Sequence, residues 1–273
     1  MCKREPELMP FIILGAKAAI SECQYQFRDR RWNCSLTDAI QRKMYSTMLH
    51  QGTREAAFMH ALTAASVAHA ITSACSKGML AEHCSCDQTL RGQSSEGDFV
   101  WSGCSDNVDF GSHASREFVD AQDKMKKKNL YKKADMKVMD PSKVNSIIKR
   151  ILMNLHNHEA GRKTLSDTLQ LNCKCHGVSG SCEVKTCWKS IAPFRTIGDV
   201  IKEKFEGATE ISRVMQEGKN FVLEAKNTQL KRHTTSDLVF LAPSPDFCSK
   251  DDSGVSFSSP LSNLLLFLSR IYF

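Results

Sequence analysis

The chain has 273 residues, and its 37 lysines and arginines against 30 aspartates and glutamates give a net charge of +7. That length is enough for one large hydrophobic core or two modest ones. The 12 cysteines, many at short spacings, exclude an ordinary cytosolic protein and predict the disulfide framework of a secreted one.

A solvated surface is the simplest explanation of the basic excess, and heparan-like polyanions such as heparan sulfate are the next partner to consider. Nucleic acid is a poor candidate, because the basic residues are not interleaved with aromatic ones. Residues 1–5 do not begin a signal peptide, since no apolar core with a cleavage site follows them. Either the true N-terminus is missing or the product stays reduced in the cytosol. The cysteines favour a missing start and secretion to the extracellular space or matrix.

The stretch Glu7 to Phe27 predicts a helix that Pro10 interrupts near its start. We expect Cys23 and Cys34 to bridge across the turn that follows. Asn33 begins the only Asn-x-Ser/Thr sequence in the chain, so it is the candidate glycosylation site.

The alanine-rich stretch Thr53 to Cys75 predicts a long amphipathic helix that stops at Gly78. Its apolar stripe comprises Phe58, Leu62, Ala65, Ala68, His69, Ile71 and Cys75. We interpret His60 and His69 as packed or surface side chains rather than metal ligands.

The stretch Ser115 to Lys133 predicts a mostly solvated helix. Lysines 126–128 could imitate a nuclear signal, but in a disulfide-bonded protein they indicate a surface face or a glycan contact. A chain break is predicted at residues 140–141, and Ser142 is expected to cap the next helix.

That next helix is predicted from Lys143 to about Leu171. Its apolar stripe comprises Val144, Ile147, Ile148, Ile151, Leu152, Leu155, Leu165 and Leu169. His156, His158 and Glu159 do not match a zinc-protease motif, so we interpret them as buried or capping polar residues.

Four cysteines then surround a run of small and polar residues at 173–188. Two nested bridges would staple this segment into a hairpin, namely Cys173–Cys187 and Cys175–Cys182.

The tip of this hairpin would lie at residues 176–181. We expect Gly177 and Gly180 to supply the positive φ angles that a tight tip needs. Ser179 would then be held out near the end of a rigid hairpin.

Three other interpretations of this segment stay open. Cys-x-Cys-His with two further cysteines could bind zinc, although it matches neither two Cys-x2-Cys pairs nor a Cys pair with a His pair. A serine between glycines suggests a hydrolase nucleophile, but Gly180 stands one place too early for Gly-x-Ser-x-Gly. The segment could also be a stapled turn without any special serine.

Beyond the hairpin, the stretch Thr196 to Glu217 predicts another amphipathic helix. Its inward residues would be Ile197, Val200, Ile201, Phe205, Ile211 and Val214. Residues 220–225 and 237–242 predict two short strands that a basic loop joins into a hairpin.

Four segments, in this order along the chain, resemble the Wnt family of secreted, lipid-modified signalling ligands. They read ECQYQFRDRRWNC at 22–34, WSGCSD at 101–106, NLHNHEAGR at 154–162 and CHGVSGSCEVKTCW at 175–188. The pattern of elements predicts a mainly α, disulfide-pinned domain with a stapled β-hairpin, and the resemblance adds a core similar to saposin-like folds.

The resemblance also implies the disulfides Cys75–Cys84 and Cys86–Cys104, which would pin the loop at 92–97. It implies a glycan on Asn33.

The family's function implies a ligand rather than an enzyme, with no metal and no cofactor. Ser179 would be esterified with palmitoleate by a membrane-bound O-acyltransferase, and a carrier protein would accompany the acylated ligand. The acyl chain would bind the cysteine-rich domain of a Frizzled receptor. In the family an LRP-type co-receptor is engaged largely through a C-terminal domain, to which the resemblance of this chain does not extend. The receptor-binding tip would comprise His176, Gly177, Val178, Ser179, Gly180 and Ser181.

Residues 1–242 would form the helical domain, and 243–248 would begin a linker. There the resemblance stops, because family members continue with a cysteine-rich C-terminal domain, whereas 249–273 contain no cysteine. The apolar stretch 260–273 is shorter than a membrane helix.

Cys2 and Cys248 are left without partners, so we expect both ends to be truncated, the second by an alternative or incorrectly joined 3′ end. Such a product could signal poorly, act as a receptor-binding antagonist, or have no independent function.

Overall fold

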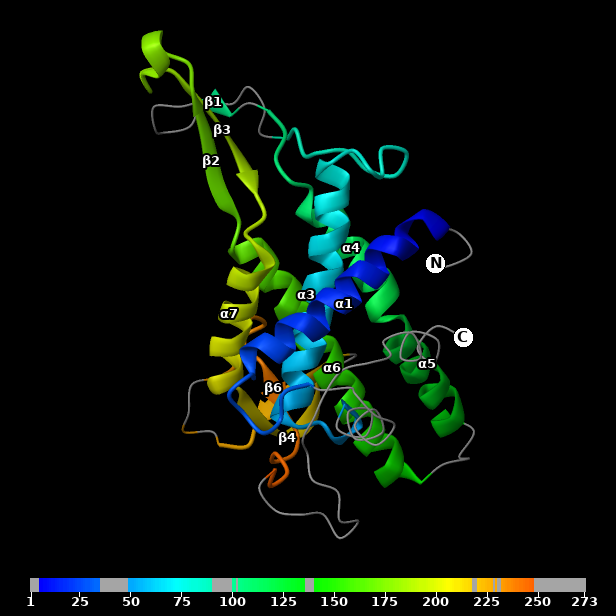
Figure 1. Ribbon diagram of the computed structural model, residues 1–273. Coiled ribbons are helices and arrows are strands. Elements are labelled where there is room, and N and C mark those ends of the chain that lie inside the picture. The colour runs from blue at the N-terminus through cyan, green and yellow to red at the C-terminus, as the bar shows by residue number, and fades with distance from the viewer. Residues whose placement is uncertain are drawn as a thin grey trace.

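The computed structural model (Figure 1) describes residues 5–34, 49–89, 100–101, 103–135, 140–217, 220–227, 229 and 232–247. They form a mainly helical domain with a long hairpin and a small second sheet, which confirms the predicted fold class. The helices are η1 (Pro6–Leu8), α1 (Met9–Gln26), α3 (Arg54–Ser76), α4 (Val108–Val119), α5 (Ala121–Asp135), α6 (Pro141–Asp167), η2 (Val178–Gly180) and α7 (Phe194–Glu206). The strands are β1 (Val100–Trp101), β2 (Gln170–Cys175), β3 (Lys185–Ser190), β4 (Thr209–Glu217), β5 (Asn220–Ala225) and β6 (Val239–Phe240). The expected loop at 92–97, Cys2, Cys248 and the tail 249–273 lie outside the described residues.

Helix α3 is the centre of the domain and contacts α1, α4, α6 and α7. It begins where the sequence predicts, because the Thr53 hydroxyl accepts a hydrogen bond from the backbone N–H of Ala56 at 3.3 Å. It ends before Gly78, which has the positive φ of 69° that favours glycine after a helix. Most of its surface is buried, so α3 depends on its neighbours for stability.

Small residues let the helices around α3 approach its backbone closely. A Cβ atom on Gly161 of α6 would lie 2.0 Å from the carbonyl oxygen of Ala61. A Cβ atom on Gly15 of α1 would lie 2.7 Å from the Cα of Val67. Both crossings are therefore backbone-to-backbone contacts that have no room for a methyl group.

An aromatic cluster joins the end of α1 to α3 and α7. The ring of Phe27 meets those of Trp32, Phe58 and Phe205 edge to face, with centroids 4.9, 5.0 and 5.0 Å apart. The expected disulfide Cys23–Cys34 holds the adjoining turn against this cluster.

Two predictions about helix starts were wrong. Pro10 lies in the first turn of α1 rather than interrupting it, because a proline there lacks only an N–H that has no partner within the helix. Asp140, not Ser142, caps α6, and its carboxylate accepts a hydrogen bond from the Ser142 backbone N–H at 2.8 Å.

Two predictions about helix extents also need correction. The helix expected at 115–133 is two helices, since a turn at Asp120 separates α4 from α5. The helix expected to reach Leu171 ends at Asp167, and β2 begins three residues later.

The region after α7 differs most from the prediction. The helix expected from Thr196 to Glu217 ends at Glu206, and residues 209–217 form β4. Strand β4 pairs antiparallel with β5 and parallel with β6, so the two predicted strands exist but do not pair with each other. Ile211 is buried, but it lies on β4 and not on a helix. The helix prediction was wrong there because one apolar residue fits the apolar stripe of a helix and the buried face of a strand equally well.

A buried charged network joins α3, α6 and the turn before α5. Arg162 is only 2% exposed, and its guanidinium donates two hydrogen bonds of 3.1 Å to Asp120 and one of 3.0 Å to Glu159. His158 lies between Asp120 and His60, with 3.0 Å from its Nδ1 to the carboxylate and 3.0 Å from its Nε2 to the other ring. Burial alone raises the pKa of Asp120, but His158 and Arg162 together hold that pKa below its ordinary value. The network gives His158 the expected buried polar role, whereas Glu159 is only half-buried, with 39% of its side chain exposed.

We expect the domain to lose stability in mild acid through His60. Burial, and then the neighbouring His158, lowers the pKa of His60 well below its ordinary value. The unfolded chain therefore binds a proton below about pH 6.5 that the folded His60 does not bind, so stability is full above that pH and falls as the pH decreases further. His60→Gln should reduce the slope of unfolding free energy against pH, between pH 6.5 and 5, by up to about 1.4 kcal/mol per pH unit.

Urea titrations at several pH values measure this slope. Other buried histidines contribute in the same direction, so the wild type and the variant must be compared at each pH. The matched control is His113→Gln, which makes the same substitution on the exposed face of α4. Equal slopes for His60→Gln and the wild type would contradict the assignment.

Candidate functional site

The hairpin of β2 and β3, called the finger below (residues 170–190), projects from the helical body (Figure 1). The two strands pair antiparallel from Gln170 opposite Ser190 to Cys175 opposite Lys185. Strand β1 adds a parallel pairing beside β3. Strand β2 is exposed along almost its whole length, so covalent and backbone bonds rather than a hydrophobic core must hold the finger in shape.

Two disulfides provide that support. Cys173 and Cys187 are directly opposite each other in the ladder, with Cα atoms 4.1 Å apart, and Cys175–Cys182 closes the tip. Cross-links of this kind restrict the unfolded chain and so stabilise a hairpin that buries little surface. Within the described residues the other bonds are Cys23–Cys34, Cys75–Cys84 and Cys86–Cys104, the pairs that the sequence led us to expect.

The tip is a tight turn built around η2. Gly177 N–H donates to the carbonyl of Ser181 at 2.8 Å, and Gly180 N–H donates to the carbonyl of Gly177 at 3.0 Å. Gly180 has the predicted positive φ, at 78°, but the prediction for Gly177 was wrong because its φ is −69°. Gly177 is required for a different reason: a Cβ atom there would lie 2.6 Å from the backbone oxygen of Ser181.

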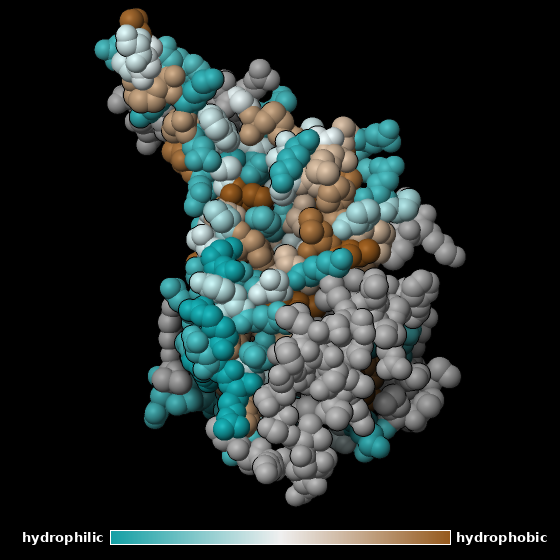
Figure 2. Space-filling view, viewed as in Figure 1, coloured by the Kyte–Doolittle hydropathy of each residue, from teal (hydrophilic) through white to brown (hydrophobic). Residues whose placement is uncertain are grey.

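Ser179 itself adopts the left-handed conformation, with φ 57° and ψ 25°. For a residue with a Cβ atom this backbone costs about 1–3 kcal/mol, and the surrounding turn and staples keep it there. The side chain is exposed, and its neighbour Val178 is 89% exposed. Figure 2 shows a small apolar area at the end of the finger, and below it polar and apolar residues are mixed.

The surroundings of Ser179 do not resemble a hydrolase site. No hydrogen bond joins its hydroxyl to another described residue, and the Nε2 of His176 lies 2.7 Å from the Thr186 hydroxyl instead. A serine nucleophile needs a base within hydrogen-bond reach. Among the described residues, no base is therefore placed to activate the Ser179 hydroxyl.

The four cysteines of the finger are disulfide-bonded, so they offer no thiolates to zinc. In the part of the chain that the structure describes, no three His, Cys, Asp or Glu side chains are grouped as a metal site.

The base of the finger is anchored by residues that the sequence reasoning did not single out. The Asp106 carboxylate accepts hydrogen bonds from the backbone N–H of Ile191 at 2.7 Å and from the hydroxyl of Ser76, at the end of α3. The Ser105 hydroxyl accepts a hydrogen bond from the Lys189 backbone N–H at 3.0 Å. The signal was the segment WSGCSD, whose polar residues follow directly after β1.

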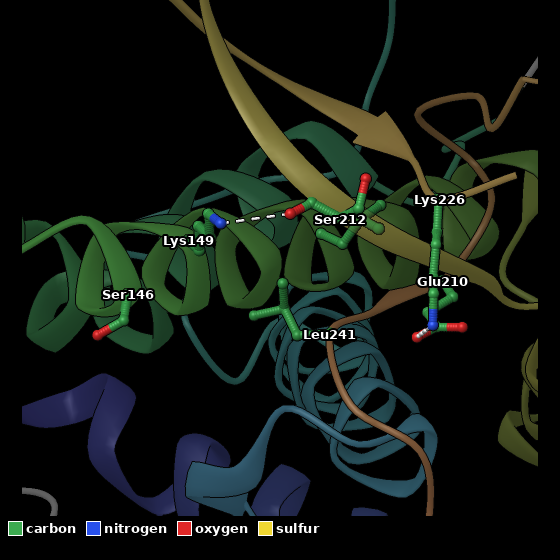
Figure 3. A pocket seen from close by; sticks show the side chains of 7 residues that line it. Ser146, Lys149, Glu210, Ser212, Lys226 and Leu241 are labelled. Carbon is green, nitrogen blue, oxygen red and sulfur yellow. Dashed lines mark hydrogen bonds and ion pairs between the residues drawn. The ribbon is translucent and has the colours of Figure 1, made fainter. Parts of the chain in front are cut away.

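A separate shallow cavity of about 370 Å³ lies between α6 and the second sheet (Figure 3). Its polar groups already have partners within the fold, since Lys149 donates to the carbonyl of Ser212 and Lys226 pairs with Glu210. None of the described helices combines the length and apolar composition that crossing a membrane requires.

Comparisons with known proteins place these features in a family. The sequence model of the wnt family matches residues 1–259. The chain is 43% identical to Protein Wnt-1 of Caenorhabditis elegans and 42% identical to Protein Wnt-5b of Homo sapiens, over 92% and 93% of this chain. It spans 67% and 65% of the length of these two relatives.

Two solved structures are similar. In human WLS in complex with WNT8A, the match has a TM-score of 0.56 and 33% identity, and it covers 89% of this chain and 70% of the other. The N-terminal domain and linker of Drosophila WntD give a TM-score of 0.53 at 18% identity, over 88% of this chain and 98% of that one, which is a likeness of fold alone.

Proposed function

Since the chain belongs to the Wnt family, we propose that it is a secreted signalling ligand that binds the cysteine-rich domain of a Frizzled receptor through palmitoleate esterified to Ser179. It acts by binding in the extracellular space or matrix, without a reaction, metal or cofactor of its own. A glycan on Asn33 accompanies this secreted state.

The presentation of Ser179 is the observation that carries the proposal. The hydroxyl lies at the exposed end of a doubly stapled finger, next to glycine and to the exposed Val178. A membrane-bound O-acyltransferase needs such a hydroxyl, because the acceptor must reach an acyl donor inside the enzyme. The Ser179 oxygen displaces the leaving group of an activated acyl donor, and that leaving group departs with the hydroxyl proton.

The acylated finger needs protection from water, because a free acyl chain would drive the ligand to membranes. A carrier protein provides this protection during secretion, and the complex of human WLS with WNT8A supports the idea by analogy. In the receptor the chain would lie in an apolar groove, and the tip residues 176–181 would contact its rim.

Further partners follow from the family and from charge. An LRP-type co-receptor would join only where a C-terminal domain is present to engage it, and heparan sulfate would bind the basic surface. The chain spans about two thirds of the length of its curated relatives, so these assemblies are proposals for the whole protein.

Mass spectrometry of the chain, secreted with a working signal peptide from cells that contain the acyltransferase, tests the proposal. We expect the peptide that spans Ser179 to carry a mono-unsaturated acyl ester, with all four finger cysteines oxidised. A folded and oxidised chain with a free Ser179 hydroxyl would refute it. Bound zinc, or reaction of Ser179 with a serine-hydrolase probe, would support the other interpretations instead.

A further inference from the structure

The finger carries positive charge directly below its apolar tip. Lys174 and Lys185 belong to the last two rungs of the ladder, and Glu183 is the one acidic residue between 170 and 190. No hydrogen bond or ion pair joins either ammonium group to another described residue. Both cations are therefore available to a partner.

These two lysines stand on opposite faces of the finger. Lys185 is paired with Cys175, the residue after Lys174, and successive residues of a strand point to opposite faces. Lys174 and Lys185, called the basic collar below, thus flank the shaft on both sides.

The distance from the tip to the collar is similar to the thickness of the headgroup region of a bilayer. Val178 is three residues beyond the last rung, which corresponds to at most about 10 Å along the finger. A bilayer's polar region occupies about 5–8 Å on each side of its hydrocarbon core, and a lysine stem can extend several ångströms along an apolar surface. When Val178 reaches the hydrocarbon boundary, the collar's ammonium groups reach the headgroups.

We propose that the finger tip docks on anionic phospholipid membranes, with Val178 and the acyl chain in the apolar boundary and the basic collar on the lipid phosphates and carboxylates. The inference rests on the proposed function for one of its two attachments, the ester on Ser179. A single acyl chain gives only marginal, reversible membrane binding, and stable attachment needs a second signal such as a basic patch. The collar supplies that second signal beside the first.

Vesicle flotation of the full secreted chain tests the docking. The probes are phosphatidylcholine vesicles with and without phosphatidylserine, and the quantity measured is the ratio of binding to the two. Lys174→Gln with Lys185→Gln should lower this ratio about 25-fold, since each lysine near an anionic surface contributes about a factor of five. Glu183→Gln should raise the ratio. High salt should abolish the difference in binding between vesicles with and without phosphatidylserine.

The matched control is Lys126→Gln with Lys128→Gln, which removes the same charge from exposed positions on α5 and should leave the ratio unchanged. Disulfide mapping and secretion yield show whether each variant is folded. A collar variant that keeps the wild-type ratio overturns the proposal. So does one that loses only binding to a Frizzled cysteine-rich domain, because the collar would then be a protein contact.

The same ratio is measured in a Ser179→Ala background. There total binding falls, but the effect of the collar on the ratio should persist. A missing ester in the mass spectrum therefore refutes the proposed function alone, whereas a ratio that does not depend on the collar in either background refutes the docking.

Discussion

Replacing Ser179 by alanine is expected to abolish acylation and to lower affinity for a Frizzled cysteine-rich domain by about a thousandfold or more. Burial of an acyl chain contributes about 0.8 kcal/mol per methylene, so five buried methylenes already contribute about 4 kcal/mol. The substitution itself should not disturb the finger, because the side chain is exposed and no described residue hydrogen-bonds to it. Surface plasmon resonance with the secreted variants measures the loss.

The matched control is Ser181→Ala, which removes a hydroxyl two residues away on the same turn. The backbone hydrogen bonds of Ser181 with Gly177 and Val178 do not use its side chain, so the turn should persist. Ser181 belongs to the tip that would contact the rim of the receptor groove, so we expect that variant to keep its ester and to lose far less affinity than Ser179→Ala. Equal affinity of Ser179→Ala and the wild type, both folded, would contradict a lipid-mediated contact.

Gly161→Ala is expected to destabilise the domain by more than about 3 kcal/mol, enough to prevent secretion of a marginally stable fold. The new Cβ atom would lie 2.0 Å from the carbonyl oxygen and 2.8 Å from the Cα of Ala61. These are backbone atoms in the middle of α3, so no side-chain rotation can relieve the clash, and the two helices must separate. Urea unfolding or secretion yield measures the effect.

Gly207→Ala provides the comparison. That glycine follows α7 with a φ of −90°, and an added Cβ atom would meet only the carbonyl oxygen of Glu203, at 3.9 Å. Gly207→Ala should change the free energy of unfolding by no more than about 1 kcal/mol in either direction. Similar stability of the two variants would mean that the crossing of α3 and α6 is looser than described.

The sequence was sufficient to predict an element where a local residue pattern is compatible with only one kind of structure. Thr53 before an alanine-rich run, with Gly78 after it, defines α3 to within one residue at each end. The cysteine spacing at 173–187 likewise predicts a stapled hairpin with Ser179 at its end.

The sequence was insufficient in two situations. In one, the same pattern of residues fits two kinds of secondary structure; in the other, the conformation depends on contacts that the sequence does not reveal. Ile211 continues the apolar spacing of α7, yet it lies on a strand because the chain turns at Gly207 and pairs with β5. The conformation of the tip depends on how closely the backbone of Gly177 approaches Ser181. That distance cannot be read from the amino-acid sequence. The role of Asp106 depends on Ile191, 85 positions later in the chain.

The anchoring of the finger by Asp106 has a consequence for how the ligand sits on a cell. This carboxylate ties the end of α3 to the backbone that leaves β3, so the finger is a fixed arm rather than a tether. In the proposed complex, a receptor that contacts only the tip would therefore also set the direction in which the helical body points. The length of the finger and its angle to the helical domain would then limit the positions above the membrane at which the helical domain can contact a second protein.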